Sequence, residues 1–148
     1  MNHVPDGHII NAMKLYFIRH GETKLNEQKI QQGRDAELSP KGVQQAKFVA
    51  NRFRDIPVDI IISSPFLRAQ QTTEEINNVL HKQVFYTELL GEVRRPKELE
   101  GKKMDDPESV RLKKMLMRNA RLKDWHYSDE ENFHDLKTRA IEFFGYLN

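Results

Sequence analysis

The chain has 148 residues, 38% of them hydrophobic, which suits one ordinary domain with a buried core. Its 24 basic and 22 acidic residues give a net charge of +2, which is too balanced for a dedicated nucleic-acid-binding protein. The lack of cysteine excludes disulfides, thiolate zinc sites and a cysteine nucleophile, and it fits the reducing cytoplasm. No apolar run approaches the ~20 residues of a membrane-spanning helix.

Residues 1–13 are predicted to be a flexible leader, because they are polar and lack the apolar stretch of a signal peptide. Met13 is an alternative start, directly before the first apolar run. The structured domain is therefore expected over residues 14–148.

The first half of the chain alternates between apolar runs and helix-start signals. Leu15–Ile18 is continuously apolar, which predicts a strand buried on both faces, and residues 20–38 read as a loop. Ser39 and Pro40 predict a helix start, with serine as N-cap and proline in the first helical position. The apolar stripe of this helix consists of Val43, Ala46, Ala50 and Phe53.

The second half continues the same alternation. Asp59–Ser63 is rich in β-branched residues and predicts a second buried strand. Ser64-Pro65 predicts the next helix start, and Gln83–Thr87 a shorter strand. The inner face of the helix between them is expected to consist of Ala69, Thr73, Ile76 and Leu80.

The remaining residues predict an irregular charged stretch over 91–106 and helices over 107–119 and from about Asp129 onward. The stripe of the last helix consists of Phe133, Leu136, Ala140, Phe143 and Leu147. Strands that alternate with helices in this way predict an α/β fold with a mostly parallel sheet. An amphipathic helix at this point normally leads into a further strand, so we expect the last strands of the sheet to be missing.

Residues suited to phosphate chemistry follow the first predicted strand. Ligands of parallel sheets bind at the carboxyl ends of the strands, where Arg19 and His20 stand. Arginine binds phosphate through its planar donors, and imidazole is a nucleophile or proton carrier that a neighbouring cation keeps neutral. Gly21 would let the backbone approach a ligand or turn sharply. The alternative, favoured by these three residues alone, is a surface histidine in a polar turn.

Two further residues lie at comparable positions. Arg68 falls in the first turn of a helix, where a cation opposes the helix dipole, and this predicts an anion nearby. An ordinary solvated arginine is the alternative. Glu92 follows the third strand and is a candidate general acid. Its competitors are Glu88, Glu98 and Glu100.

Together these segments resemble the histidine phosphatase superfamily, the phosphoglycerate-mutase-like group, from Lys14 to the end of the chain. The matching blocks are Arg19–Thr23 with Asn26, Gln32–Asp35 with Leu38–Gly42 and Gln45-Ala46, Ser63–Pro65 with Arg68, Ala69 and Thr72, Glu92, and Glu131–Phe133 with Arg139. Their order makes the resemblance specific. It implies a mostly parallel sheet with helices on both faces.

The resemblance also implies a mechanism on a small phosphorylated metabolite, without a metal or organic cofactor. His20 would attack phosphorus to form a phosphohistidine, and Glu92 would protonate the leaving alcohol and then take a proton from water. Transition-state charge would be offset by arginine. Phosphate or substrate contacts are implied for Arg19, Asn26, Gln32, Gly33 and Arg68. Neither a nucleic acid nor a membrane is an implied partner, and the oligomeric state is not predicted.

One departure from the family is the absence of its second histidine, which lies in a Ser-His-Gly segment at the end of a later strand. His81, His126 and His134 have no such context. The chain is therefore expected to be a C-terminally truncated fragment that lacks one phosphate donor, and a comparable loss elsewhere costs about 10²–10³-fold in rate.

Another departure follows Glu92. Phosphoglycerate mutases carry Arg-His-Tyr-Gly and a longer insertion there, whereas this chain reads Val93–Lys97 (VRRPK). The difference favours a phosphatase over a mutase. Arg94 and Arg95 are candidates for a second anionic group, with a solvated basic loop as the alternative. A catalytically impaired phosphate-binding fragment also stays open.

Overall fold

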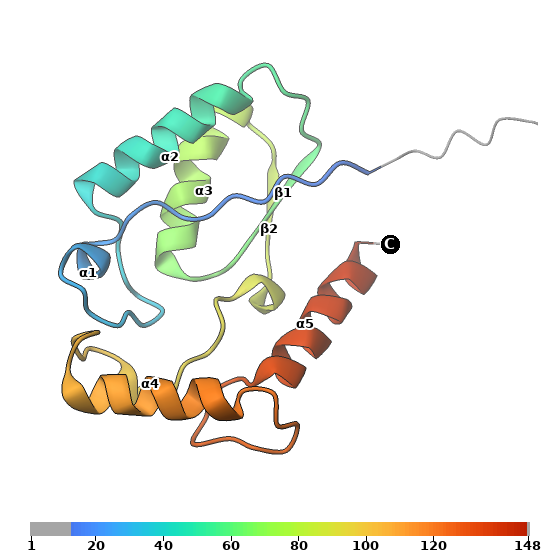
Figure 1. Cartoon of the computed structure of the whole chain (residues 1–148). Coiled ribbons are helices and arrows are strands. Elements are labelled where there is room, and N and C mark those ends of the chain that lie inside the picture. Colours follow the sequence, from blue (N-terminus) through green and yellow to red (C-terminus); the bar gives the residue numbers. More distant parts are fainter. Residues whose placement is uncertain (1–12, 148) are drawn as a thin grey trace, which may run out of the picture.

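The computed structural model describes residues 13–147, and Figure 1 shows their arrangement. The elements in chain order are α1 (Lys24–Glu27), α2 (Pro40–Phe53), β1 (Ile60–Ser63), α3 (Leu67–Leu80), β2 (Gln83–Tyr86), the 3₁₀ turns η1 (Glu88–Leu90) and η2 (Lys97–Leu99), α4 (Pro107–Asn119) and α5 (Phe133–Tyr146). The predicted leader lies outside the described residues, except for Met13.

A small parallel sheet lies at the centre of the fold. β1 and β2 pair in register from Ile60 opposite Gln83 to Ser63 opposite Tyr86. α3 connects the two strands and contacts β1, and α2 packs on α3 (Figure 1). This order confirms the predicted α/β class with parallel strands.

Helix α2 forms as the sequence predicts. The Ser39 hydroxyl accepts a hydrogen bond from the Gly42 N–H at 3.1 Å, and Pro40 occupies the first turn, where an amide hydrogen would have no partner in the helix. Ala46 and Ala50 are fully buried. Their small side chains let α2 lie close to α3.

The predicted start of α3 at Ser64-Pro65 is wrong by a few residues. The helix begins at Leu67, and its N-cap Phe66 supplies no side-chain cap. Ser64 instead accepts from the Phe66 N–H at 3.3 Å within the turn after β1. The Leu67 N–H donates to the Arg34 carbonyl at 3.1 Å, so a distant loop takes over part of the capping.

The predicted strand over Leu15–Ile18 is wrong. These residues run as a drawn-out segment past β1, and they pair with no strand in the described part of the chain (Figure 1). All four side chains are exposed, Phe17 to 73%. A strand needs a ladder partner for its backbone groups, and apolar composition does not supply one. β1 is likewise less buried than predicted, because Ile60 is half exposed.

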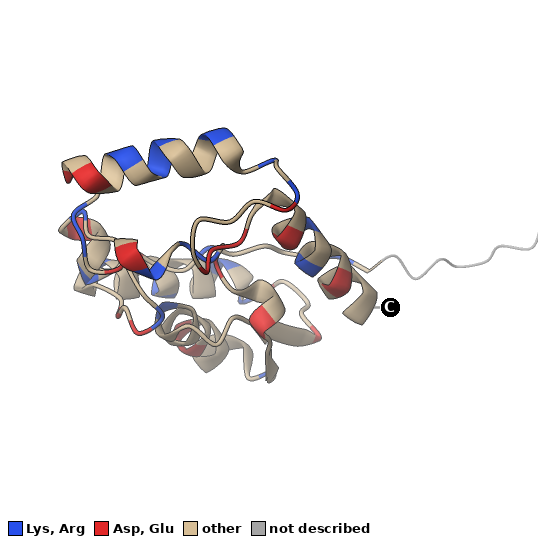
Figure 2. Ribbon diagram, turned by 90° about the horizontal axis from the view of Figure 1, so that it is seen from below, with Lys and Arg blue, Asp and Glu red and all other residues tan. Residues whose placement is uncertain are grey.

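A second apolar cluster supports α4, whose predicted range is confirmed. Leu99, Leu112 and Leu116 are buried against Met115 and Trp125. Figure 2 shows basic residues spaced along this helix.

Helix α5 begins at Phe133 rather than near Asp129. Glu130 holds the preceding turn, because its carboxylate accepts from the N–H groups of Tyr127 and Ser128. Asn132 then caps the helix. Of the predicted stripe only Phe143 is buried. None of the helices between residues 13 and 147 is long and apolar enough to span a membrane.

Candidate active site

Arg68 joins three segments that are far apart in the chain. It occupies the first turn of α3 and is only 2% exposed. Its Nε–H donates to His20 Nε2 at 3.2 Å, and its two terminal nitrogens donate to the Gly33 carbonyl at 2.7 Å and to Glu92 Oε2 at 2.8 Å. Four of the predicted site residues therefore meet in one hydrogen-bond network. The reason is the fork of donors that a guanidinium offers.

The hydrogen bonds of His20 define its tautomer. Nδ1 lies 2.7 Å from the Gly21 carbonyl oxygen, which can only accept, so Nδ1 carries the hydrogen. Nε2 then accepts from Arg68 through its lone pair. A neutral imidazole with an unprotonated Nε2 is the form that acts as a nucleophile.

The electrostatic surroundings of His20 favour the same neutral form. Burial is the main cause that lowers its pKa below 6.5, and Arg68 and Arg19 also lower it, against the Gly21 carbonyl and Glu92. From the sequence, the lowering of the His20 pKa was predicted from the neighbouring Arg19 cation alone. Burial outweighs that cation, and Arg68 also contributes more, because both depend on the packed structure.

We expect His20 to titrate below its ordinary value of 6.5 and to carry no charge at pH 7. As the pH falls below 6.5 the unfolded chain binds this proton first, so the stability that the neutral His20 contributes is present above pH 6.5 and is lost as the pH falls through the folded pKa. NMR titration of the imidazole gives this pKa directly. Urea unfolding of the wild type and His20→Gln at several pH values is the control. A titration midpoint of the His20 imidazole at or above pH 6.5 contradicts the expectation.

Glu92 differs from the competing glutamates by its contact with Arg68. It follows η1, and its side chain is 51% exposed. The competitors lie elsewhere: Glu88 pairs with Arg34, Glu98 accepts from Ser128, and Glu100 lies beside Gly33. Among these four glutamates, Glu92 alone hydrogen-bonds to Arg68, and its catalytic role stays a prediction.

Thr23 holds two other predicted residues, and sequence reasoning gave it no role. The Thr23 N–H donates to Asn26 Oδ1 at 3.2 Å, and the Thr23 hydroxyl donates to Gln32 Oε1 at 2.8 Å. Thr23 is fully buried and is the N-cap of α1. Thr23 and Asn26 have the spacing of a capping box, which was the signal in the sequence. The phosphate contacts of Asn26 and Gln32 stay predictions.

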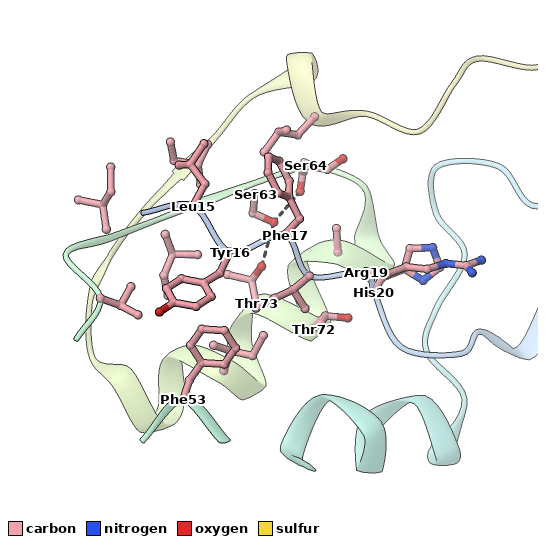
Figure 3. Close-up of a pocket in the computed structure, with 18 of the residues that line it drawn as sticks. Leu15, Tyr16, Phe17, Arg19, His20, Phe53, Ser63, Ser64, Thr72 and Thr73 are labelled. Atoms are coloured by element: carbon pink, nitrogen blue, oxygen red, sulfur yellow. Dashed lines mark hydrogen bonds between the residues drawn. The ribbon is translucent and has the colours of Figure 1, made fainter. Parts of the chain in front are cut away.

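Arg19 is exposed and lies beside His20 in Figure 3. Between residues 13 and 147 it finds no hydrogen-bond or ion-pair partner for its side chain. It therefore has free donors for an anion.

Gly21 lies against helix α2. A Cβ at this position would lie 2.3 Å from the Gly42 carbonyl oxygen of α2. The Gly21 N–H donates to the Thr72 hydroxyl at 3.1 Å, and this hydroxyl donates to the Arg68 carbonyl at 2.7 Å. Thr72, matched above only as part of a sequence block, therefore connects the segment that carries His20 to α3.

The network lies beside a hollow of about 790 Å³ between residues 13–20, β1 and α3. Figure 3 shows Arg19 and His20 at one side of the lining and Tyr16 and Phe53 at the other. The walls away from His20 are mainly apolar, as at Ile62 and Ile76. Both arginines that line the hollow, Arg19 and Arg68, lie at the end that carries His20.

The other histidines of the described chain have separate surroundings. His81 ends α3 in a left-handed conformation, His126 pairs with Asp135 at 2.7 Å, and His134 lies 3.1 Å from the Arg121 carbonyl. Among residues 13–147, no cluster of three or more His, Cys, Asp or Glu is arranged to hold a metal ion.

The two arginines after Glu92 differ in their surroundings. Arg94 donates from Nε to the Asp129 carbonyl, which holds it against the turn before α5. Arg95 is exposed. Of this pair, Arg95 has the greater freedom to meet a second anionic group.

Curated proteins of similar sequence match part of this chain. "Putative phosphoserine phosphatase 2" from Hydrogenobacter thermophilus is 42% identical over 81 residues, 54% of this chain and 40% of that protein. "Probable phosphoglycerate mutase GpmB" from Enterobacter sp. (strain 638) is 45% identical over 65 residues, 43% of this chain and 30% of that protein. The match thus spans less than half the length of these curated relatives.

The fold is also that of solved proteins. The structure of Bacillus stearothermophilus YhfR aligns with a TM-score of 0.71 and 26% identity, over 87% of this chain and 64% of that one. A sequence model of the histidine phosphatase superfamily (branch 1) matches residues 15–148. The chain belongs to the histidine phosphatase superfamily.

Proposed function

We propose that this chain is the part of a cytoplasmic phosphomonoester hydrolase that carries its nucleophile, and that the substrate is a small phosphorylated metabolite. The observation that carries the proposal is the Arg68 network, in which one buried guanidinium contacts both His20 Nε2 and Glu92. This arrangement supports a site in which His20 would be the nucleophile, Arg68 the phosphate-binding cation and Glu92 the proton donor toward one phosphoryl group.

The proposed reaction has two steps. His20 Nε2 attacks phosphorus, the bond from phosphorus to the ester oxygen breaks, and Glu92 protonates the departing alcohol. Water then attacks the phosphohistidine, Glu92 takes its proton, and phosphate leaves with His20 restored. The phosphoryl oxygens would take over Arg68 donors that His20 and Glu92 occupy in the free site. Arg19 would add a second cation.

The test is hydrolysis of p-nitrophenyl phosphate from pH 5 to 8 in the presence of a chelator, by the 148-residue chain and by His20→Ala. We expect turnover in the wild type, with an acid-labile phosphoprotein after rapid quenching, and neither in the variant, because the nucleophile is gone. His81→Asn is the matched control, since asparagine tolerates the left-handed conformation of His81 (φ 51°). Equal turnover in the wild type and His20→Ala contradicts the proposal.

Phosphoglycerate-mutase-type transfer is the second candidate, and the similarity to the probable phosphoglycerate mutase of Enterobacter favours it. The two reactions differ in the acceptor of the phosphoryl group. ³¹P NMR of a reaction with 3-phosphoglycerate distinguishes them, because a hydrolase yields inorganic phosphate and a mutase yields the 2-phospho isomer. Phosphate binding without His20-dependent turnover would instead indicate an impaired phosphate-binding fragment.

A further inference from the structure

The loop that carries Glu92 is held from α5 by Arg139. Its Nη1 donates to the carbonyl oxygens of Leu89 at 2.9 Å and Gly91 at 2.7 Å, directly before Glu92. The other two nitrogens bind Glu131 in a two-pronged pair, at 2.7 and 2.8 Å. Arg139 therefore connects the backbone before Glu92 to the start of α5.

Glu131 holds the same loop on the other side of Glu92. Its Oε2 accepts from the Arg94 N–H at 2.8 Å, and its own N–H donates to the Arg94 carbonyl at 3.0 Å. The side chains of Glu131 and Arg139 are 10% and 17% exposed. Burial works against the charge of Glu131, but Arg139 and the Arg94 N–H outweigh it and lower its pKa. The pair is thus ionic and largely shielded from solvent.

Glu92 depends on this backbone for its position. Its half-exposed carboxylate hydrogen-bonds to Arg68, the same donor that a phosphoryl group is proposed to occupy. Once a substrate takes that donor, the loop has to keep the carboxyl group beside the leaving oxygen. Misplacement by about 1 Å can cost about 10²-fold in rate.

We propose that the Glu131–Arg139 pair positions Glu92. The pair determines how closely the carboxyl group of Glu92 approaches the leaving group, and the pair itself does not touch the substrate. This inference rests on the proposed hydrolase function. It assigns to α5 a role in proton transfer and none in phosphate binding.

The test uses Arg139→Lys and two substrates that differ in their need for an acid. Nitrophenolate departs without a proton, whereas the alkoxide of glycerol 2-phosphate requires one. A lysine ammonium keeps the charge but cannot bind Glu131 and both carbonyls at once. We expect kcat/KM for glycerol 2-phosphate, which reports phosphoryl transfer to His20, to fall about 10²-fold, with kcat/KM for p-nitrophenyl phosphate and inhibition by inorganic phosphate unchanged. Arg118→Lys, on the exposed side of α4, is the control.

Hydrogen exchange of the Gly91 and Arg94 amides gives a second readout that needs no turnover. We expect faster exchange at these amides in Arg139→Lys, with α2 and α3 unchanged. Equal loss of kcat/KM on both substrates, or unchanged exchange, overturns the positioning role. If the wild type is inert on both substrates, the hydrolase function fails, and the exchange data still decide whether the pair holds the loop.

Discussion

Arg68→Met is expected to lower kcat about 10²–10³-fold, because it removes the one guanidinium that contacts His20, Gly33 and Glu92. Methionine keeps much of the apolar stem of the buried side chain. The phosphoryl oxygens would then lose their main buried donor, although Arg19 remains. We also expect the acid limb of the pH–rate profile to move to higher pH, because Arg68 is one of the causes that lower the pKa of His20.

Steady-state kinetics on p-nitrophenyl phosphate and the NMR titration of His20 measure both effects. Arg118→Met is the matched control, since Arg118 is exposed and lies in α4. The Arg68→Met substitution also leaves the Gly33 carbonyl without its donor. The assays therefore belong at a temperature at which thermal unfolding shows that the Arg68→Met protein is folded. A folded Arg68→Met with unchanged kcat would contradict a phosphate-binding role for Arg68.

Gly21→Ala is expected to lower the free energy of unfolding by about 1–3 kcal/mol, as overpacking of a filled site does. The added methyl group would lie 2.3 Å from the Gly42 carbonyl oxygen and 2.9 Å from its Cα. These are backbone atoms of α2, so no side-chain rotation relieves the contact. Separation of the two segments would also lengthen the hydrogen bond from Gly21 to Thr72, and activity should fall with stability.

Urea unfolding measures this effect, with Gly145→Ala as the matched control. Gly145 lies in α5, and a Cβ there meets nothing within 4 Å. Alanine in a helix is favoured over glycine by about 0.5–1 kcal/mol, so this control should be slightly stabilised. If Gly21→Ala were as stable as the wild type, the close packing of Gly21 on Gly42 would be wrong.

The elements with local signals were predictable. Ser39 and Pro40 fix the start of α2 through neighbours in the chain, and the apolar spacing and caps of α4 likewise act within one helix. Strand β1 follows from a β-branched run, and β2 from a short run of valine and aromatic residues. The segment Leu15–Ile18 has an equally strong local signal and forms no strand, because ladder formation depends on a partner elsewhere.

The candidate site divides in the same way. His20, Arg68 and Glu92 were predicted as site residues from their residue types after the expected strands, since the chemistry of a side chain is written in the sequence. Their contacts were not, because each hydrogen bond joins segments far apart in the chain.

The sequence by itself determined the α/β order and the residues able to perform phosphate chemistry, because caps, periodicity and functional groups are local properties. The tertiary structure alone decided that Gly21 packs on Gly42, that Thr23 holds Gln32, and that Arg139 holds the Glu92 loop. These contacts depend on which backbone atoms approach one another after folding. No pattern within one segment encodes that distance.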